Sequence, residues 1–121
     1  MRIIEAARTS SGEEPAEEFL QRLDCSRREK NTRRLADIAI IFEEYGRTGT
    51  LEIPRELNDL RRGGLWEIKA ADTRFPFYEL TDNDHTAKVT RLTSGFLKGT
   101  LPTPRKEIDK ALWVMGEDRQ S

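Results

Sequence analysis

The sequence has few of the residues from which enzymes build metal centres or nucleophilic sites. It contains one cysteine, Cys25, and one histidine, His85, in 121 residues. A single cysteine excludes an internal disulfide and a cysteine zinc site, which fits a reducing compartment. His85 lies in the polar stretch DNDH, where local hydrogen bonding is a sufficient explanation, and a serine or cysteine nucleophile would need a histidine base beside it. We therefore expect neither a metal centre nor a catalytic triad.

Long apolar runs and phosphate-binding loops are also missing. The longest apolar run is IAIIF at 38–42, and the N-terminal MRIIEAARTS reaches charged residues too early for a secretory signal. We expect a cytoplasmic protein with no membrane segment. Gly63 and Gly64 are adjacent and no G-K-[ST] follows them, which argues against a nucleotide-hydrolysing enzyme.

The charge balance limits how the chain could bind nucleic acid. Charged and hydrophobic residues each make up 36% of the chain, which suits one domain spanning 1–121 with a modest core and a well-solvated surface. Carboxylates outnumber cations in residues 1–60, and cations outnumber carboxylates in 61–110. A net charge of -1 argues against tight binding to free nucleic acid, so another macromolecule would have to present it.

The first half of the chain predicts a short strand followed by a helical hairpin. MRIIEAAR is typical of a strand, and EEPAEEFLQRL predicts a helix that begins near Pro15. Ser26 and Glu29 have the spacing of a capping box, and apolar residues then recur at helical spacing until Gly46. The basic side chains at the start of this second helix are interpreted as a solvated face: Arg27, Arg28, Lys30, Arg33 and Arg34.

The second half predicts a sheet and a final helix, so the expected fold class is α+β. Residues 46–64 are expected to form a connector. LWEIKA, RFPFYEL and AKVTRLTS then predict an antiparallel meander, in which Pro76 requires a bulge or an unpaired edge. Thr103 is the expected N-cap of a helix that ends before Gly116, and the last residues, EDRQS, are expected to fray. Trp66 and Trp113 are interpreted as core anchors.

A set of cations and one phenol lies on or next to these predicted strands. Arginine can hold a phosphate with two hydrogen bonds, and a lysine or tyrosine with a shifted pKa can transfer protons. In RNA the adjacent 2′-hydroxyl can itself attack phosphorus, so such a site needs no metal ion. The same side chains could instead face water on an exposed sheet, and their spacing does not decide between the two. The set comprises Arg61, Arg62, Lys69, Arg74, Tyr78, Arg91 and Lys98.

Three stretches resemble a known family. They are LRRGGLWEIK, TRFPFY and GFLKGTLPTPRKEIDKA, and in order and spacing they resemble the RelE/HigB-type toxins, in the branch described as phage-derived. The resemblance covers residues 57–112. It implies a compact α/β domain whose mixed or antiparallel sheet is backed by helices, acting as the toxin of a type II toxin–antitoxin system.

The resemblance also implies an activity and its partners. Such toxins cleave messenger RNA on the translating ribosome without a metal or other cofactor, and a cognate antitoxin, here expected to be a helix-turn-helix protein, neutralises them. The ribosome would present the substrate, so the chain need not bind free RNA tightly. By position, the resemblance assigns catalysis to Arg74, Lys69, Lys98 and Tyr78. We add Arg61, Arg62 and Arg91 as candidate RNA contacts.

The roles implied for these residues follow the chemistry of RNA cleavage. Arg74 would stabilise the scissile phosphate, and Lys69 or Lys98 would activate the 2′-hydroxyl or neutralise charge. Tyr78 would transfer a proton or stack on a base.

Departures from the family pattern keep a second function open. Gly99 and Pro102 stand where the family commonly has lysines, and Pro76 interrupts the strand that carries Arg74. The alternative is a catalytically weak or inactive module of the same fold that serves as antitoxin partner, co-repressor or non-cleaving translation inhibitor. A third possibility, a phage structural or accessory protein, predicts no toxicity.

Overall fold

The computed structural model describes residues 2–81, 88–99 and 103–120, so His85 and Pro102 lie outside the described residues. Within them the chain is a small α+β domain with three helices and a mixed sheet of six strands, which confirms the predicted class. The elements in chain order are β1 (Arg2–Ala6), α1 (Pro15–Cys25), α2 (Glu29–Thr48), β2 (Leu57–Asp59), β3 (Trp66–Ala70), β4 (Thr73–Thr81), β5 (Lys88–Leu92), β6 (Phe96–Leu97) and α3 (Arg105–Arg119).

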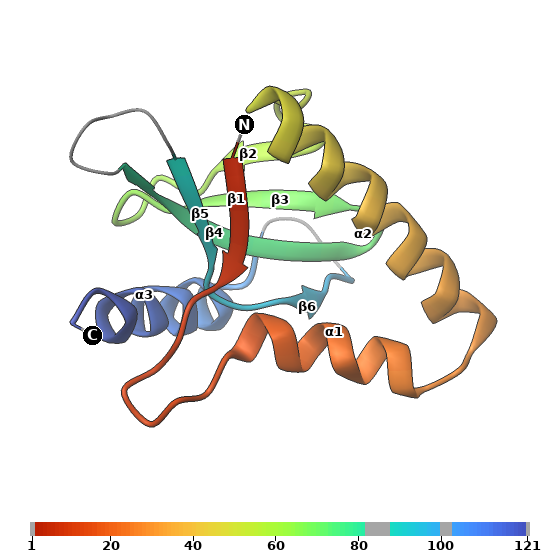
Figure 1. The fold of residues 1–121 in the computed structure, drawn as a ribbon, viewed down its shortest axis with the longest axis horizontal. Helices are drawn as coiled ribbons and strands as arrows, with labels where there is room; N and C mark the ends of the chain where they lie inside the picture. The colour runs from red at the N-terminus through yellow and green to blue at the C-terminus, as the bar shows by residue number, and fades with distance from the viewer. Residues whose placement is uncertain (1, 82–87, 100–102, 121) are drawn as a thin grey trace.

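The sheet has the order β1-β5-β4-β3-β2, and β6 pairs with β4 beyond the end of β5 (Figure 1). The predicted meander is confirmed, because β3, β4 and β5 pair antiparallel in succession. β1 pairs parallel with β5, which makes the sheet mixed. β2 lies within the segment predicted as a connector and pairs with β3. That prediction was wrong because a three-residue strand is too short to show an alternating pattern.

The two faces of the sheet are covered by different helices. Side chains alternate between the faces along each strand. Ile68, Phe75, Phe77 and Leu92 pack with α1 and α2 in the larger core. The opposite face carries a smaller core, in which Leu65 and Tyr78 of the sheet region pack against Ala111 and Met115 of α3. Trp66 is partly buried against the larger core.

The ends of the hairpin helices differ from the predicted ones. The expected capping box is absent: the Ser26 hydroxyl donates to the Leu23 carbonyl at the end of α1 (3.1 Å), and α2 begins without a side-chain cap. α2 also continues through Gly46 to Thr48 and ends at Gly49, whose left-handed φ of 73° suits glycine. None of the helices in the described part of the chain has the length and apolar character to span a bilayer.

The last helix also corrects four predictions. The Thr103 hydroxyl binds Glu67 and does not cap α3, which continues through Gly116 to Arg119. The final turn does not fray, since Asp118 is buried. Trp113 was expected in the core but is 56% exposed. The buried residues of α3 are Ala111, Val114, Met115 and Asp118, and the helical repeat turns position 113 away from this buried stripe.

A β-bulge lies opposite Phe75, next to Pro76. Pairing between β3 and β4 is continuous through Pro76, so β4 itself carries no bulge on that side. On the other side Phe77 pairs with Leu92 and Arg74 pairs with Phe96, and Thr93 donates its N–H to the Pro76 carbonyl (2.9 Å). Two residues, Ser94 and Gly95, therefore stand opposite Phe75 alone, which is the arrangement of a bulge. The predicted irregularity exists, but it belongs to the neighbouring segment.

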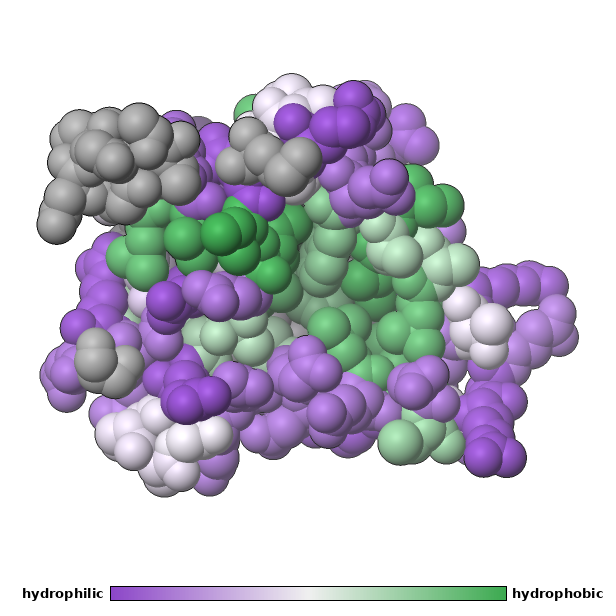
Figure 2. Space-filling model, viewed as in Figure 1, coloured by the Kyte–Doolittle hydropathy of each residue, from purple (hydrophilic) through white to green (hydrophobic). Residues whose placement is uncertain are grey.

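A hollow opens on the side of the helical hairpin. On the face in Figure 2, hydrophobic side chains gather in the middle, with hydrophilic ones around them. The hollow encloses roughly 380 Å³ between β1, α1 and α2, and its lining includes the apolar residues Ile4, Ala6, Ala16, Leu20 and Phe42 and the charged residues Arg2, Glu5, Glu17 and Glu43. Ile4 and Ala6 pack with the larger core, so this hollow lies across the sheet from α3.

Candidate functional site

Three of the predicted catalytic residues lie together at one end of the sheet. Lys69 of β3 and Arg74 of β4 are directly opposite in the strand register. Arg74 also pairs with Phe96 of β6, and two residues later Lys98 donates its backbone N–H to the Asp72 carbonyl (2.8 Å). All three side chains are half-buried. We call Lys69, Arg74 and Lys98 the cation cluster.

The cation cluster is held without neutralising partners. Within the described residues, none of its members has a carboxylate at ion-pair distance. Burial lowers the pKa of Lys98, and the charges of Arg74 and Lys69 lower it further, while the charge of Glu67 opposes them. Like charges this close repel one another and attract an anion. The arrangement therefore suits the binding of a phosphate.

Arg74 is oriented by the turn between β3 and β4. Its Nη1 donates to the carbonyls of Ala71 and Thr73, both at 2.8 Å. Its Nε is buried and has no hydrogen-bond partner in the described part of the chain. A buried donor without a partner is costly, so an anion that reached Nε would be stabilised there.

Glu67 is a member of the site that the sequence interpretation did not include. It is fully buried, on the same face of β3 as Lys69, and both carboxylate oxygens lie within 2.9 Å of the Thr103 hydroxyl. Its charge acts on Lys98. The alternation in WEIKA could have revealed it, because Glu67 is a carboxylate two residues before Lys69 in an otherwise apolar strand.

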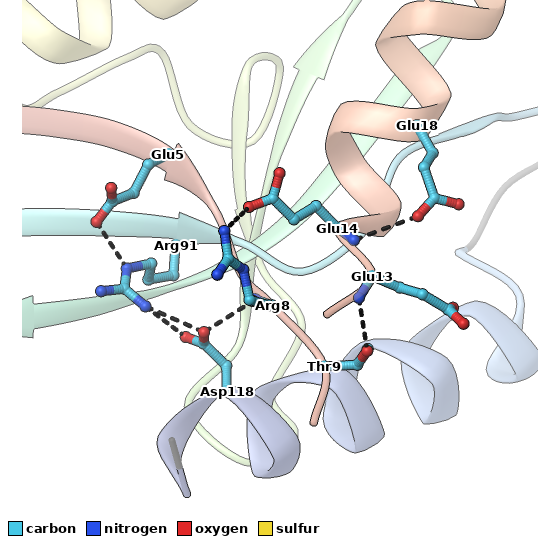
Figure 3. Close-up of polar contacts among 8 residues, drawn as sticks. All are labelled: Glu5, Arg8, Thr9, Glu13, Glu14, Glu18, Arg91 and Asp118. Carbon is cyan, nitrogen blue, oxygen red and sulfur yellow. Dashed lines mark hydrogen bonds and ion pairs between the residues drawn. The ribbon is translucent and has the colours of Figure 1, made fainter. Parts of the chain in front are cut away.

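Tyr78 and Arg91 do not join the cation cluster. The Tyr78 hydroxyl donates to Asp118 of α3, and its ring is buried. Arg91 binds the same carboxylate through Nη1 at 2.9 and 3.0 Å, and its Nε donates to Glu5 (2.9 Å), as Figure 3 shows. These residues join β1, β4 and β5 to the last turn of α3. The structure therefore gives them a structural position, away from the cluster.

Arg61 and Arg62 lie in the turn between β2 and β3, at the other end of β3 from Lys69. Both are exposed. Arg61 has a left-handed φ of 58°, and its N–H donates to Asp59 (2.8 Å). Arg62 pairs with Asp109 of α3 (3.3 Å). These two residues are thus separated from the cluster by the length of the strand.

The two tyrosines, Tyr45 and Tyr78, give a test of these burial assignments. Burial raises both pKa values, and hydrogen bonds to Glu79 and Asp118 raise them further. When folding raises the pKa of a tyrosine, the neutral tyrosine stabilises the folded state. This contribution is fully present below the unfolded-state pKa of about 10 and is lost as the pH rises from there through the folded-state pKa. We expect no tyrosinate absorbance from the folded chain at a pH of about 10, whereas the urea-denatured chain is half ionised there. Half-ionisation of either tyrosine in the folded chain at that pH would contradict this assignment.

No group of three or more histidine, cysteine, aspartate or glutamate side chains in the described ranges is placed to hold a metal ion. No protein-family model matches the sequence, and no curated protein matches it significantly. The function must therefore be argued from the cation cluster and its surroundings.

Proposed function

We propose that this chain is the toxin of a type II toxin–antitoxin system, a RelE-like endoribonuclease that cleaves messenger RNA on the ribosome. The observation that carries the proposal is the cation cluster: Lys69, Arg74 and Lys98 share one end of the sheet and have no carboxylate partner among the described residues. Three such cations match the negative charge that grows on the phosphate oxygens during RNA cleavage. RNA is proposed as the substrate because the sequence motifs resemble those of the RelE/HigB-type toxins.

The proposed reaction needs only the RNA and this chain's side chains. The 2′-oxygen attacks phosphorus, the bond from phosphorus to the 5′-oxygen breaks, and the products are a 2′,3′-cyclic phosphate and a 5′-hydroxyl. Arg74 stabilises the charge on the phosphate oxygens. Lys98, whose pKa is lowered, is suited to accept the 2′ proton in its neutral form, and Lys69 to donate a proton to the leaving oxygen. Tyr78 has no role in this scheme, because its hydroxyl is bound to Asp118.

The alternative is a binding module of the same fold that does not cut RNA, and one observation favours it. Nη1 of Arg74 is directed to two backbone carbonyls, so this donor must leave them before it can serve a phosphate. Gly99, which is exposed, adds no cation to the cluster. Such a module would still bind an antitoxin or the ribosome but would leave messenger RNA intact.

Removal of single cations from the cluster separates these functions. We expect Arg74→Ala and Lys98→Ala each to lower the cleavage rate by about 10²–10³-fold, the usual loss for a donor that stabilises transition-state charge. Tightly induced expression would be scored for growth arrest, with new 5′-hydroxyl ends mapped in cellular messenger RNA. Arg47→Ala is the matched control, because Arg47 is exposed on α2 and paired with Glu44.

Three results would decide the matter. Arrest with new ends that disappear in the folded Arg74→Ala variant supports the nuclease. Arrest without new ends contradicts it and supports the non-cleaving inhibitor. Absence of arrest contradicts toxin activity.

A further inference from the structure

A basic groove lies between the helical hairpin and β6. It encloses roughly 430 Å³ and is open along one side. Leu97, half-exposed on β6, forms one of its walls. The full lining is Phe19, Arg22, Leu23, Arg28, Lys30, Asn31, Arg34 and Leu97, which we call the hairpin groove.

The hairpin groove is lined by four cations and no carboxylate. Arg22, Arg28 and Lys30 are exposed, and within the described residues none of them forms an ion pair. Arg22 lies over the ring of Phe19 with its guanidinium carbon 5.9 Å from the ring centre, so its position is partly fixed. These residues include part of the basic run that the sequence suggested was a solvated face. Arg28 and Lys30 are exposed, as a solvated face requires, and with Arg34 they also line a concave surface.

The groove and the cation cluster lie on opposite faces of the sheet, with β6 and the turn between β3 and β4 between them. Arg34 binds Asp72 with two hydrogen bonds of 2.8 and 2.6 Å, and the Asp72 carbonyl accepts the backbone N–H of Lys98. Leu97 lines the groove, and the next residue, Lys98, belongs to the cluster. The ion pair between Arg34 and Asp72 therefore lies between the exposed cations of the groove and the cation cluster.

We propose that the hairpin groove binds the sugar–phosphate backbone of single-stranded RNA that continues from the cation cluster. Unpaired cations can contact successive phosphates, and the apolar wall at Leu97 can contact a sugar or base. The proposal rests on the proposed function, because the strand held in the groove is the one on which the cluster acts. In this proposal the groove increases the affinity for RNA, and the cation cluster carries out the cleavage.

Binding of an RNA that cannot be cleaved tests the groove separately from catalysis. A fluorescent 2′-O-methyl oligouridylate lacks the attacking hydroxyl, and its affinity for the full chain would be measured by anisotropy at several salt concentrations. The groove variant is Arg22→Ala/Arg28→Ala/Lys30→Ala. The matched control is Arg33→Ala/Arg47→Ala/Arg55→Ala, which removes the same charge from exposed arginines that pair with nearby glutamates outside the groove.

We expect the groove variant to bind about 10-fold more weakly, with the salt slope reduced by about 2, since each lost phosphate contact on a single strand removes about 0.7. The control is expected to retain its affinity within about twofold. Equal losses in both variants would overturn the proposal, as would an unchanged groove variant or an unmodified chain that fails to bind. Preferential competition by polyglutamate would also overturn it and indicate an acidic protein segment as the occupant.

The result does not depend on cleavage. If the groove variant loses binding while the unmodified chain never cuts RNA, the groove is an RNA-binding site, and both the nuclease and the link between the groove and cleavage are refuted. If the unmodified chain cuts RNA and the groove variant binds RNA as tightly as the unmodified chain does, the nuclease is supported and the groove proposal is refuted.

Discussion

Replacing Asp118 with alanine is expected to lower the free energy of unfolding by about 3–5 kcal/mol, the usual cost of removing one partner from a buried charged pair. The Asp118 side chain is 1% exposed. It accepts hydrogen bonds from Arg91 and from the backbone N–H of Arg8 (2.9 Å), as Figure 3 shows, and another from the Tyr78 hydroxyl. One carboxylate thus ties the last turn of α3 to β4, to β5 and to the segment after β1.

The loss should be large because the partners of Asp118 cannot all find substitutes. The Tyr78 hydroxyl is buried and would lose its acceptor, which is more costly than losing an exposed hydrogen bond. Among the described residues, Arg91 would keep only Glu5 as an ion-pair partner, and the Glu5 side chain is 47% exposed. Urea unfolding measures the effect. Asp109→Ala is the control, because Asp109 lies on the same helix and pairs with exposed Arg62 and Arg105, where a loss below about 1 kcal/mol is expected. A loss for Asp118→Ala as small as that of the control would refute the assignment.

Replacing Gly95 with alanine is expected to lower the free energy of unfolding by about 1–3 kcal/mol through overpacking. A Cβ at this position would lie 2.4 Å from Cδ2 of Phe19 and 2.8 Å from Cε1 of Phe75. The two rings pack edge to face with their centres 5.6 Å apart in the larger core. Neither ring can move without disturbing its neighbours, because protein interiors are closely packed.

Gly99→Ala provides the comparison for Gly95→Ala. No atom of the described residues lies within 4 Å of a Cβ built at Gly99, so we expect the unfolding free energy of Gly99→Ala to remain within about 0.5 kcal/mol of that of the unmodified chain. Urea unfolding of both variants would give the difference. If Gly95→Ala were as stable as Gly99→Ala, the bulge at Ser94 and Gly95 would not pack as described.

The regular elements could be predicted from the sequence, whereas the short and irregular ones could not. The hairpin helices and the meander have enough residues for their apolar periodicity to be recognised. β2, with three residues, and β6, with two, are defined only by the strands beside them. The parallel pairing of β1 with β5 joins segments more than eighty residues apart, and local patterns carry no information about such a contact.

The candidate site could be predicted only where strand geometry determined it. Lys69 and Arg74 flank a tight turn, so their cross-strand pairing follows from the meander. Tyr78 was grouped with them because it lies on the same strand. Its actual partner is Asp118, forty residues away in a segment expected to fray. The hairpin groove was missed for a similar reason: its unpaired cations all lie in the acidic half of the chain, and only the fold brings them next to β6.

The bulge at Ser94 and Gly95 has a consequence for the tolerance of this segment to changes in length. Leu92 faces the hairpin helices, and strict alternation from there would direct Lys98 to the same side. The extra residue reverses the alternation, so that Phe96 stands opposite Arg74 and Lys98 reaches the face that carries Lys69 and Arg74. Deletion of either Ser94 or Gly95 would keep every cation of the cluster in the sequence, but it would direct the Lys98 side chain to the opposite face of the sheet. Length between β5 and β6 is therefore as much a part of this site as the identity of its side chains.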